Sequence, residues 1–197
     1  DHVPLACPFS AYPEIVEKFS GRIISWCTFN PIVKALRDQR KEPEGTAIME
    51  QGTVSGCVLD ISRVLGCKKV MFIGQDMCVR DDGRYYTDDS FYADHGNHYF
   101  SKDKGQRLPG NTQDKVLVEP RLFVYLKTFE QFIAKKDESV EYRNLARTGA
   151  RIEGAPYINY EEATQWVGDS NSKSFDNKLS GLLQKQEINT DLKRLFD

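Results

Sequence analysis

The sequence lacks the cysteine patterns that define disulfide-rich and zinc-binding proteins. Its 197 residues contain five cysteines, an odd number that argues against a disulfide framework. No two of them form a Cys-x-x-Cys pair, and none lies at zinc-ligand spacing from a histidine. These absences predict no metal site and favour buried thiols in a reducing cytoplasm.

Long apolar segments and an excess of one charge are also missing. No apolar run approaches the about 20 residues of a membrane span, and the first residues show no signal peptide. The first residue is Asp rather than Met, which favours a trimmed start. The 27 basic and 29 acidic residues give a formal net charge of −2, which gives no electrostatic reason to bind nucleic acid. We therefore expect a cytoplasmic protein that neither spans a membrane nor binds nucleic acid.

One stretch, residues 52–86, combines the features of a ligand site in an α/β fold. Thr53 or Ser55 can cap a helix, and a hydroxyl-rich helix N-terminus also suits a phosphate. The apolar run KKVMFI at residues 68–73 is typical of a buried parallel strand. Asp76 follows that strand, at the edge where ligands of α/β sheets bind. The sequence therefore makes Asp76 a candidate for contact with a ribose, a base or a metal, or a residue that caps its loop.

Strand and helix patterns alternate through the chain. The predicted strands are residues 3–7, 22–27, 68–73 and 140–145, with a turn at 108–111 and a brief extended segment at 116–118. The predicted helices lie within residues 8–20, 32–37, 53–65, 119–133, 160–167 and 175–196. This alternation predicts an α/β fold class, a Rossmann-like parallel sheet with flanking helices and a C-terminal helical tail.

The predicted organisation is one α/β domain followed by a short tail. The domain covers residues 1–167, and a linker and helix cover residues 168–197. Four strands are few for a Rossmann-like sheet, so we expect an N-terminal strand–helix portion to be missing. The apolar face of the tail helix offers a surface for oligomer formation.

A polar segment, residues 80–106, interrupts the alternation, and a loop of this length is usually functional or mobile. His95 and His98 are candidates for a catalytic base, because histidine titrates near neutral pH, or are solvated. A His-x-x-His metal site, or Mg²⁺ held by the aspartates at 81–82 and 88–89, competes with a solvated acidic loop. Three arginines that could reach a carboxylate or a phosphate follow later in the chain: Arg143, Arg147 and Arg151.

Four segments together resemble a known family of domains. They are GTVSGCVLDISRVLGCKKVMFIGQDM (52–77), LPGNTQDKVLVEP (108–120), RLFVYLKTFEQFI (121–133) and NLARTGARIEGAPY (144–157). The chain resembles the central domain of the motility-associated factor (Maf) flagellin glycosyltransferases, a group that includes 6-hydroxymethylpterin diphosphokinase-like proteins. More distantly it is similar to the bacterial sialyltransferases that use CMP-sialic acid. The resemblance covers about residues 3–165.

The resemblance implies a nucleotide pocket around the central stretch. Thr53 and Ser55 lie near the hydroxyl pair that contacts the phosphate and sugar of the nucleotide in the sialyltransferases. Gly74 and Asp76 match the Gly-x-Asp that lines their pocket. A Gly-Pro-Ser-type loop normally lies upstream and is absent here, which implies a fragment of a larger protein or a site that lacks one half.

The chain also departs from the family at the positions that act on the leaving group. The resemblance implies two tyrosines that bind the leaving phosphate; Tyr85 or Tyr86 can supply one, and Cys78 stands in place of the other. The catalytic histidine of the sialyltransferases falls near Gly110 and Asn111, where this chain has none. A base, if one is used, must come from elsewhere, and the two loop histidines are the hypothesis.

The function implied by the resemblance is sugar transfer. A CMP-activated donor would give a nonulosonic or sialic-type acid to a hydroxyl on a protein or glycan, with no cofactor required. One alternative is a pterin diphosphokinase-like enzyme, in which Asp76 and the acidic loop hold Mg²⁺-ATP. The other is a non-catalytic, truncated domain that serves assembly.

Overall fold

The computed structural model describes residues 4–8, 11–26, 48, 52–80, 83, 104–135 and 139–168. The chain divides into two compact units, one formed by Asp1–Ile48 with Asp169–Asp197 and the other by Met49–Gly168. The helices predicted at residues 32–37 and 175–196, and the oligomer surface assigned to the second of them, lie outside the described residues.

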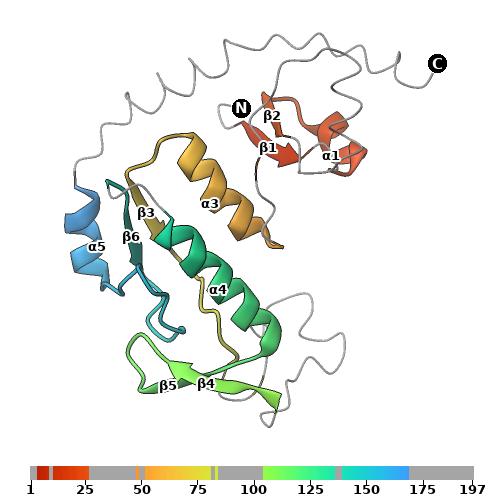
Figure 1. The fold of residues 1–197 in the computed structure, drawn as a ribbon. Coiled ribbons are helices and arrows are strands. Elements are labelled where there is room, and N and C mark those ends of the chain that lie inside the picture. Colours follow the sequence, from red (N-terminus) through yellow and green to blue (C-terminus); the bar gives the residue numbers. More distant parts are fainter. Residues whose placement is uncertain are drawn as a thin grey trace. The chain divides into compact units, whose positions relative to one another are not determined.

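The first unit contains a strand–helix–strand motif (Figure 1). β1 (Leu5–Pro8) runs parallel to β2 (Ile23–Trp26), and α1 (Pro13–Lys18) lies between them in the chain. Pro13 suits the first turn of α1, because a proline lacks only an N–H that this turn leaves unused. The order confirms the strand, helix and strand predicted within residues 3–27.

The second unit is built on another parallel pair of strands. α3 (Val54–Val64) leads into β3 (Lys69–Phe72), and α4 (Pro120–Ala134) leads into β6 (Glu141–Asn144). Phe72 lies opposite Asn144 in the parallel register. Both helices begin at the end of the unit where the two strands finish (Figure 1). The predicted helix and strand of the central stretch are confirmed.

Local sequence explains where α3 begins and ends. The Oγ1 atom of Thr53 accepts a hydrogen bond from the Gly56 N–H at 2.9 Å, so Thr53 is the N-cap. Gly66 has a φ of 70° directly after the helix, a left-handed conformation that glycine adopts without a steric cost. The predicted capping role of Thr53 and the stop at Gly66 are both confirmed.

One predicted turn belongs to a strand. β4 (Gln106–Pro109) pairs antiparallel with β5 (Lys115–Val118), whereas the sequence predicted a turn at residues 108–111. The turn falls later, at Gly110–Asp114. Proline has no N–H to donate, but an edge strand tolerates it, so Pro109 can be the last residue of β4. The fold is therefore a mixture of parallel and antiparallel pairs. The described strands form sheets of two strands each, so the wider Rossmann-like sheet stays a prediction.

Aromatic rings join α4 to one face of the β3–β6 pair. The ring centroid of Phe72 lies 5.5 Å from that of Phe129 and 6.2 Å from that of Tyr142. Phe129 and Tyr142 are both buried, together with Leu126 and Ile133 on the same face of α4. Burial of a large apolar side chain stabilises a fold by about 1.5–3 kcal/mol, so this cluster is the main source of cohesion in the unit.

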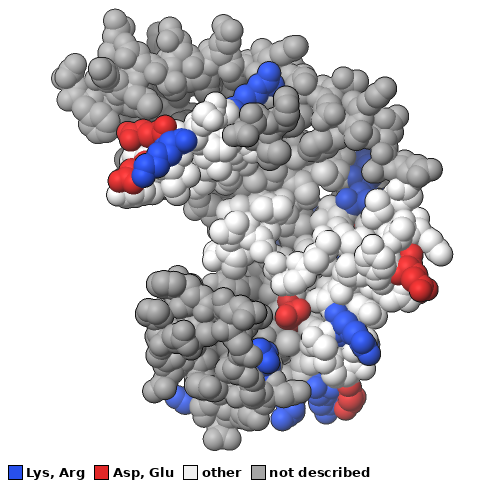
Figure 2. Space-filling model, turned by 180° about the vertical axis from the view of Figure 1, so that it is seen from behind, with Lys and Arg blue, Asp and Glu red and all other residues white. Residues whose placement is uncertain are grey.

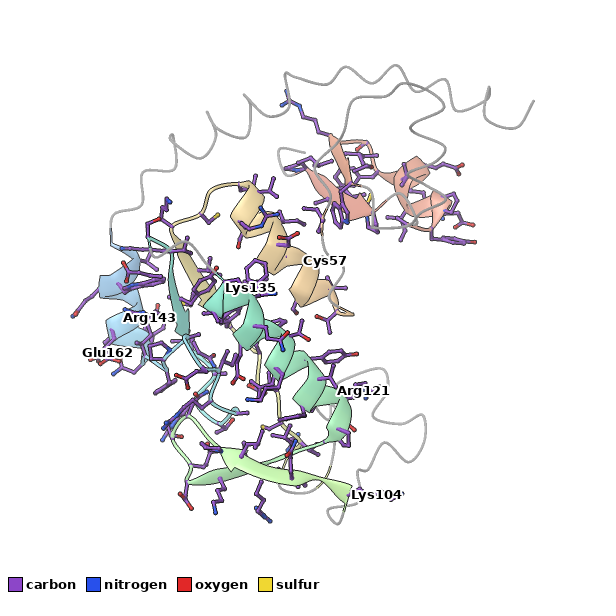
Figure 3. All side chains as sticks on the ribbon, viewed as in Figure 1. Cys57, Lys104, Arg121, Lys135, Arg143 and Glu162 are labelled. Atoms are coloured by element: carbon purple, nitrogen blue, oxygen red, sulfur yellow. The ribbon has the colours of Figure 1, made fainter. Side chains whose placement is uncertain are left out.

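Polar groups hold α5 (Tyr160–Val167) to the other side of the strand pair. The Trp166 ring lies 5.3 Å from Lys69 Nζ and 5.4 Å from Arg143 Cζ, and its Nε1 donates to Glu141 Oε2 at 3.0 Å. In Figure 3 the labelled Arg143 lies between β6 and α5. Asn159 begins α5 with a reciprocal capping box that also uses the Glu162 side chain. Along β6, Glu141 and Arg143 therefore face α5, while Tyr142 and Asn144 face the core.

Charges on the described part of the face in Figure 2 do not form one large field. On the face that Figure 2 shows, basic and acidic side chains are interspersed with uncharged ones. Among the described residues, no helix combines the length and the apolar character needed to cross a membrane.

Tyr142 makes the stability of the second unit sensitive to alkaline pH. Burial raises the pKa of its phenol above the ordinary value of 10.0, and Cys67 adds to the rise. The folded chain holds this proton more tightly than the unfolded chain, so the contribution is complete below about pH 10 and is lost as the pH rises through the folded pKa. Tyr142→Phe should flatten the alkaline fall in unfolding free energy, measured by urea titration at a series of pH values.

Tyr160→Phe is the matched control, because Tyr160 is 77% exposed. It should leave the alkaline curve of the natural chain unchanged. An unchanged curve in the Tyr142→Phe chain would show that another group causes the alkaline loss.

Candidate functional site

Three loops meet at the end of the second unit where β3 and β6 finish. The first, Gly74–Cys78, follows β3, and the second, Leu145–Arg151, follows β6. The third is the turn Gly110–Asp114 between β4 and β5. We call this region the three-loop site. Ligands of parallel α/β sheets bind at such carboxyl ends, so the region is the candidate functional site.

The loop after β3 holds an unusual backbone conformation. Gly74 has a φ of 68° and Met77 a φ of 51°, which places both in the left-handed region. Met77 is not a glycine and is buried, so its conformation costs on the order of 1 kcal/mol or more and is held by its surroundings. Asp76, between these two residues, is exposed at the surface. Strained backbone of this kind clusters at functional sites, which supports a role for the loop.

The first and second loops touch through their backbones. The Ala150 N–H donates to the Asp76 carbonyl oxygen at 2.7 Å. A Cβ atom at Gly149 would lie 2.8 Å from that same oxygen and 2.9 Å from Asp76 Cα, closer than van der Waals contact allows. Only glycine fits at position 149 without moving Asp76.

The turn between β4 and β5 binds the second loop from the other side. The Asn111 N–H donates to the Gly149 carbonyl oxygen at 2.9 Å, and Asn111 Nδ2 donates to the Ala146 carbonyl oxygen at 2.6 Å. Thr112 Oγ1 donates to the Arg147 carbonyl oxygen at 2.9 Å. The second loop is therefore clamped between the loop that carries Asp76 and the turn that carries Asn111.

Two asparagines at the site, the buried Asn144 and the half-buried Asn111, each keep one buried side-chain atom without a hydrogen-bond partner among the described residues. Asn144 Oδ1 accepts from the Ala146 N–H at 2.9 Å, but Asn144 Nδ2 is buried and unpartnered. Asn111 Oδ1 is likewise buried and unpartnered. Sequence reasoning missed both residues. The available signal was an asparagine at the apolar end of a strand and another in a Pro-Gly-Asn turn.

The structure brings together only some of the residues predicted from the sequence. Gly74 and Asp76 lie at the tip of β3 as predicted. The hydroxyl of Thr53 caps α3, and Ser55, half-buried, lies in the first turn, so their phosphate role stays a prediction. The other predicted site residues lie outside the described residues: Tyr85, Tyr86, His95 and His98.

Other candidates from the sequence fall at different places. Arg143 contacts Trp166 and Glu141 beside α5, away from the three-loop site. Arg147 and Arg151 are exposed in the second loop. Cys78, which the resemblance to the sialyltransferases aligns with a tyrosine, lies with its Sγ 3.6 Å from the Thr148 carbonyl oxygen. Within the described parts of the chain, no three acidic, histidine or cysteine side chains gather as metal ligands.

Comparison with known proteins assigns no function to the site. No protein-family model, no curated protein and no solved structure matches the chain. The resemblance to the Maf and sialyltransferase-like domains, and the residue roles that it implies, therefore stay predictions.

Gly149 gives a direct test of the clamp. Gly149→Ala should destabilise the second unit by about 1–3 kcal/mol, because the new Cβ pushes the backbone of Asp76 away. Urea unfolding measures the loss, and the amide shifts of Asp76 and Ala150 report the displacement. Thr148→Ala, at the exposed neighbouring position, should change neither quantity. Equal stability of the two variants would contradict the close packing of the loops.

Proposed function

We propose that the three-loop site binds a nucleotide and that the chain is a glycosyltransferase-like domain. By resemblance, the donor is a CMP-activated nonulosonic or sialic-type acid, and the acceptor is a hydroxyl on a protein or glycan. The observation that carries the proposal is the exposed Asp76 at a strand tip, held by strained backbone and pressed against Gly149. An exposed carboxylate on a backbone that the fold holds so closely is poorly explained by packing alone.

The proposal extends to the fold and the location of the chain. Parallel sheets are rarely found as isolated pairs, because both of their faces must be covered. We therefore expect the β3–β6 pair to belong to a wider, Rossmann-like sheet. We also expect the protein to work in the cytoplasm, as the composition predicts.

Each element of the site has a proposed part in the transfer. Asp76 contacts the ribose or the base, and the first turn of α3 at Thr53 and Ser55 favours the phosphate. The acceptor oxygen attacks the anomeric carbon, the bond from that carbon to the phosphate oxygen breaks, and CMP leaves with the electron pair. Tyr85 or Tyr86 donates to the departing phosphate. The acceptor proton passes to His98 or His95.

Nucleotide binding separates this function from its alternatives. CMP should bind without metal in a calorimetric titration, and Asp76→Ala should weaken binding at least about tenfold. Glu161→Ala is the matched control, because it removes an exposed carboxylate from the first turn of α5, outside the three-loop site. Binding of ATP alone, and only with Mg²⁺, would favour the pterin diphosphokinase reading. No binding together with a concentration-dependent mass would favour an assembly domain.

The identity of the base is tested by the histidines. His98→Ala or His95→Ala should lower the rate of sugar transfer from a CMP-sialic acid by about 10²–10⁴-fold and leave CMP affinity unchanged, because the base acts only on the acceptor. His2→Ala, the third histidine of the chain, is the control. Full activity of both loop variants would remove the two histidines from the mechanism.

A further inference from the structure

Two asparagines hold both hydrogen-bonding groups of one backbone residue. Asn111 Nδ2 donates to the Ala146 carbonyl oxygen at 2.6 Å, and the Ala146 N–H donates to Asn144 Oδ1 at 2.9 Å. An amide nitrogen cannot accept these bonds and an amide oxygen cannot donate them. The contacts to Ala146 therefore fix the orientation of both side-chain amides.

This arrangement leaves one acceptor and one donor unused. The acceptor is Asn111 Oδ1 and the donor is Asn144 Nδ2, and neither has a hydrogen-bond partner in the described part of the chain. The Asn144 side chain is buried, with 0% of the residue exposed. An unsatisfied buried polar group is costly, and a native fold that keeps two of them in one site needs a reason for each.

The chemistry of the pair restricts what can satisfy it. An anion would meet the lone pairs of Asn111 Oδ1, so neither a phosphate nor a carboxylate suits both atoms. A cation would meet the N–H of Asn144. An uncharged group that both donates and accepts hydrogen bonds suits the acceptor and the donor alike.

We propose that Asn111 and Asn144 form a neutral recognition subsite of the three-loop site. The subsite takes an uncharged donor–acceptor group of the ligand, which in a nucleotide is the amide-like edge of the base or a sugar hydroxyl. Asn111 Oδ1 accepts from that group and Asn144 Nδ2 donates to it. The subsite rests on the proposed nucleotide-binding function and adds its specificity-determining residues. Because both atoms are buried, the group enters when the second loop, Leu145–Arg151, shifts.

The side-chain amide of Asn144 reports the subsite in the natural chain. We expect its ¹H–¹⁵N resonances to shift when CMP is added. Cytidine and ribose 5-phosphate identify the source of the group. A shift with cytidine alone assigns the subsite to the base, and a shift with both assigns it to a sugar hydroxyl. Inorganic phosphate alone should leave these resonances unchanged.

The variant Asn144→Asp provides a second, independent readout. It keeps the oxygen that accepts from Ala146, replaces the Nδ2 donor with a carboxylate oxygen and adds a negative charge. CMP affinity should fall at least about tenfold, while affinity for inorganic phosphate stays unchanged. Asn159→Asp is the matched control, because it makes the same exchange at the exposed N-cap of α5, where aspartate also caps.

The outcomes separate the subsite from the wider function. If CMP shifts the backbone amides of Gly74 and Asp76 but not the Asn144 side chain, the subsite is wrong and nucleotide binding stands. A water molecule that stays bonded to both asparagines in the CMP complex would also overturn it. If no nucleotide shifts any resonance of the site, both proposals fail.

Discussion

The contact between Asp76 and the Gly149–Ala150 backbone is the constraint on which the three-loop site depends. Two loops from different strands meet there at a hydrogen bond of 2.7 Å, with no room for a Cβ atom. The contact requires glycine at position 149, and Met77, which follows Asp76, has left-handed backbone. The bend at Met77 is offset by its burial, because burying a methionine side chain stabilises by about 1.5–3 kcal/mol. Asp76 therefore has a fixed backbone and a side chain that stays exposed.

The two faces of the β3–β6 pair are held by different forces. On the core side, Phe72, Phe129 and Tyr142 contribute through burial and through ring contacts. On the side of α5, Trp166 contacts cations that remain partly in solvent, where each such contact contributes about 0.5–1 kcal/mol. The packing on the core side therefore holds the end of β6 more firmly than the contacts with α5 do. Asn144 shares the core-facing parity of Tyr142, so the rigid side of the sheet also positions the buried amide.

The sequence could predict what depends on local pattern. The cap at Thr53, the stop at Gly66 and the apolar run of β3 are local signals, and the structure has each of them. The strand β4 was missed because Pro109 and Gly110 resemble a turn, and only its pairing with β5 makes it a strand. Asn111 contacts Ala146, which lies 35 positions later in the chain. Gly149 contacts Asp76, which lies in a much earlier segment. No pattern within one segment carries such contacts.

Magnitudes indicate which part of the site determines selectivity. Thr53 already accepts the hydrogen bond of the Gly56 N–H. An anion at the start of α3 could therefore use only the backbone amides that precede Gly56 and the helix dipole. The dipole stabilises an anion at an exposed position by about 0.3–1 kcal/mol. Each unsatisfied buried amide group in the asparagine pair costs about 1–3 kcal/mol until a partner arrives. In the proposed complex, the gain from pairing the neutral groups would therefore exceed the gain from placing the phosphate. A ligand of this site would be distinguished by its uncharged part, while its phosphate would contribute mainly to where it lies.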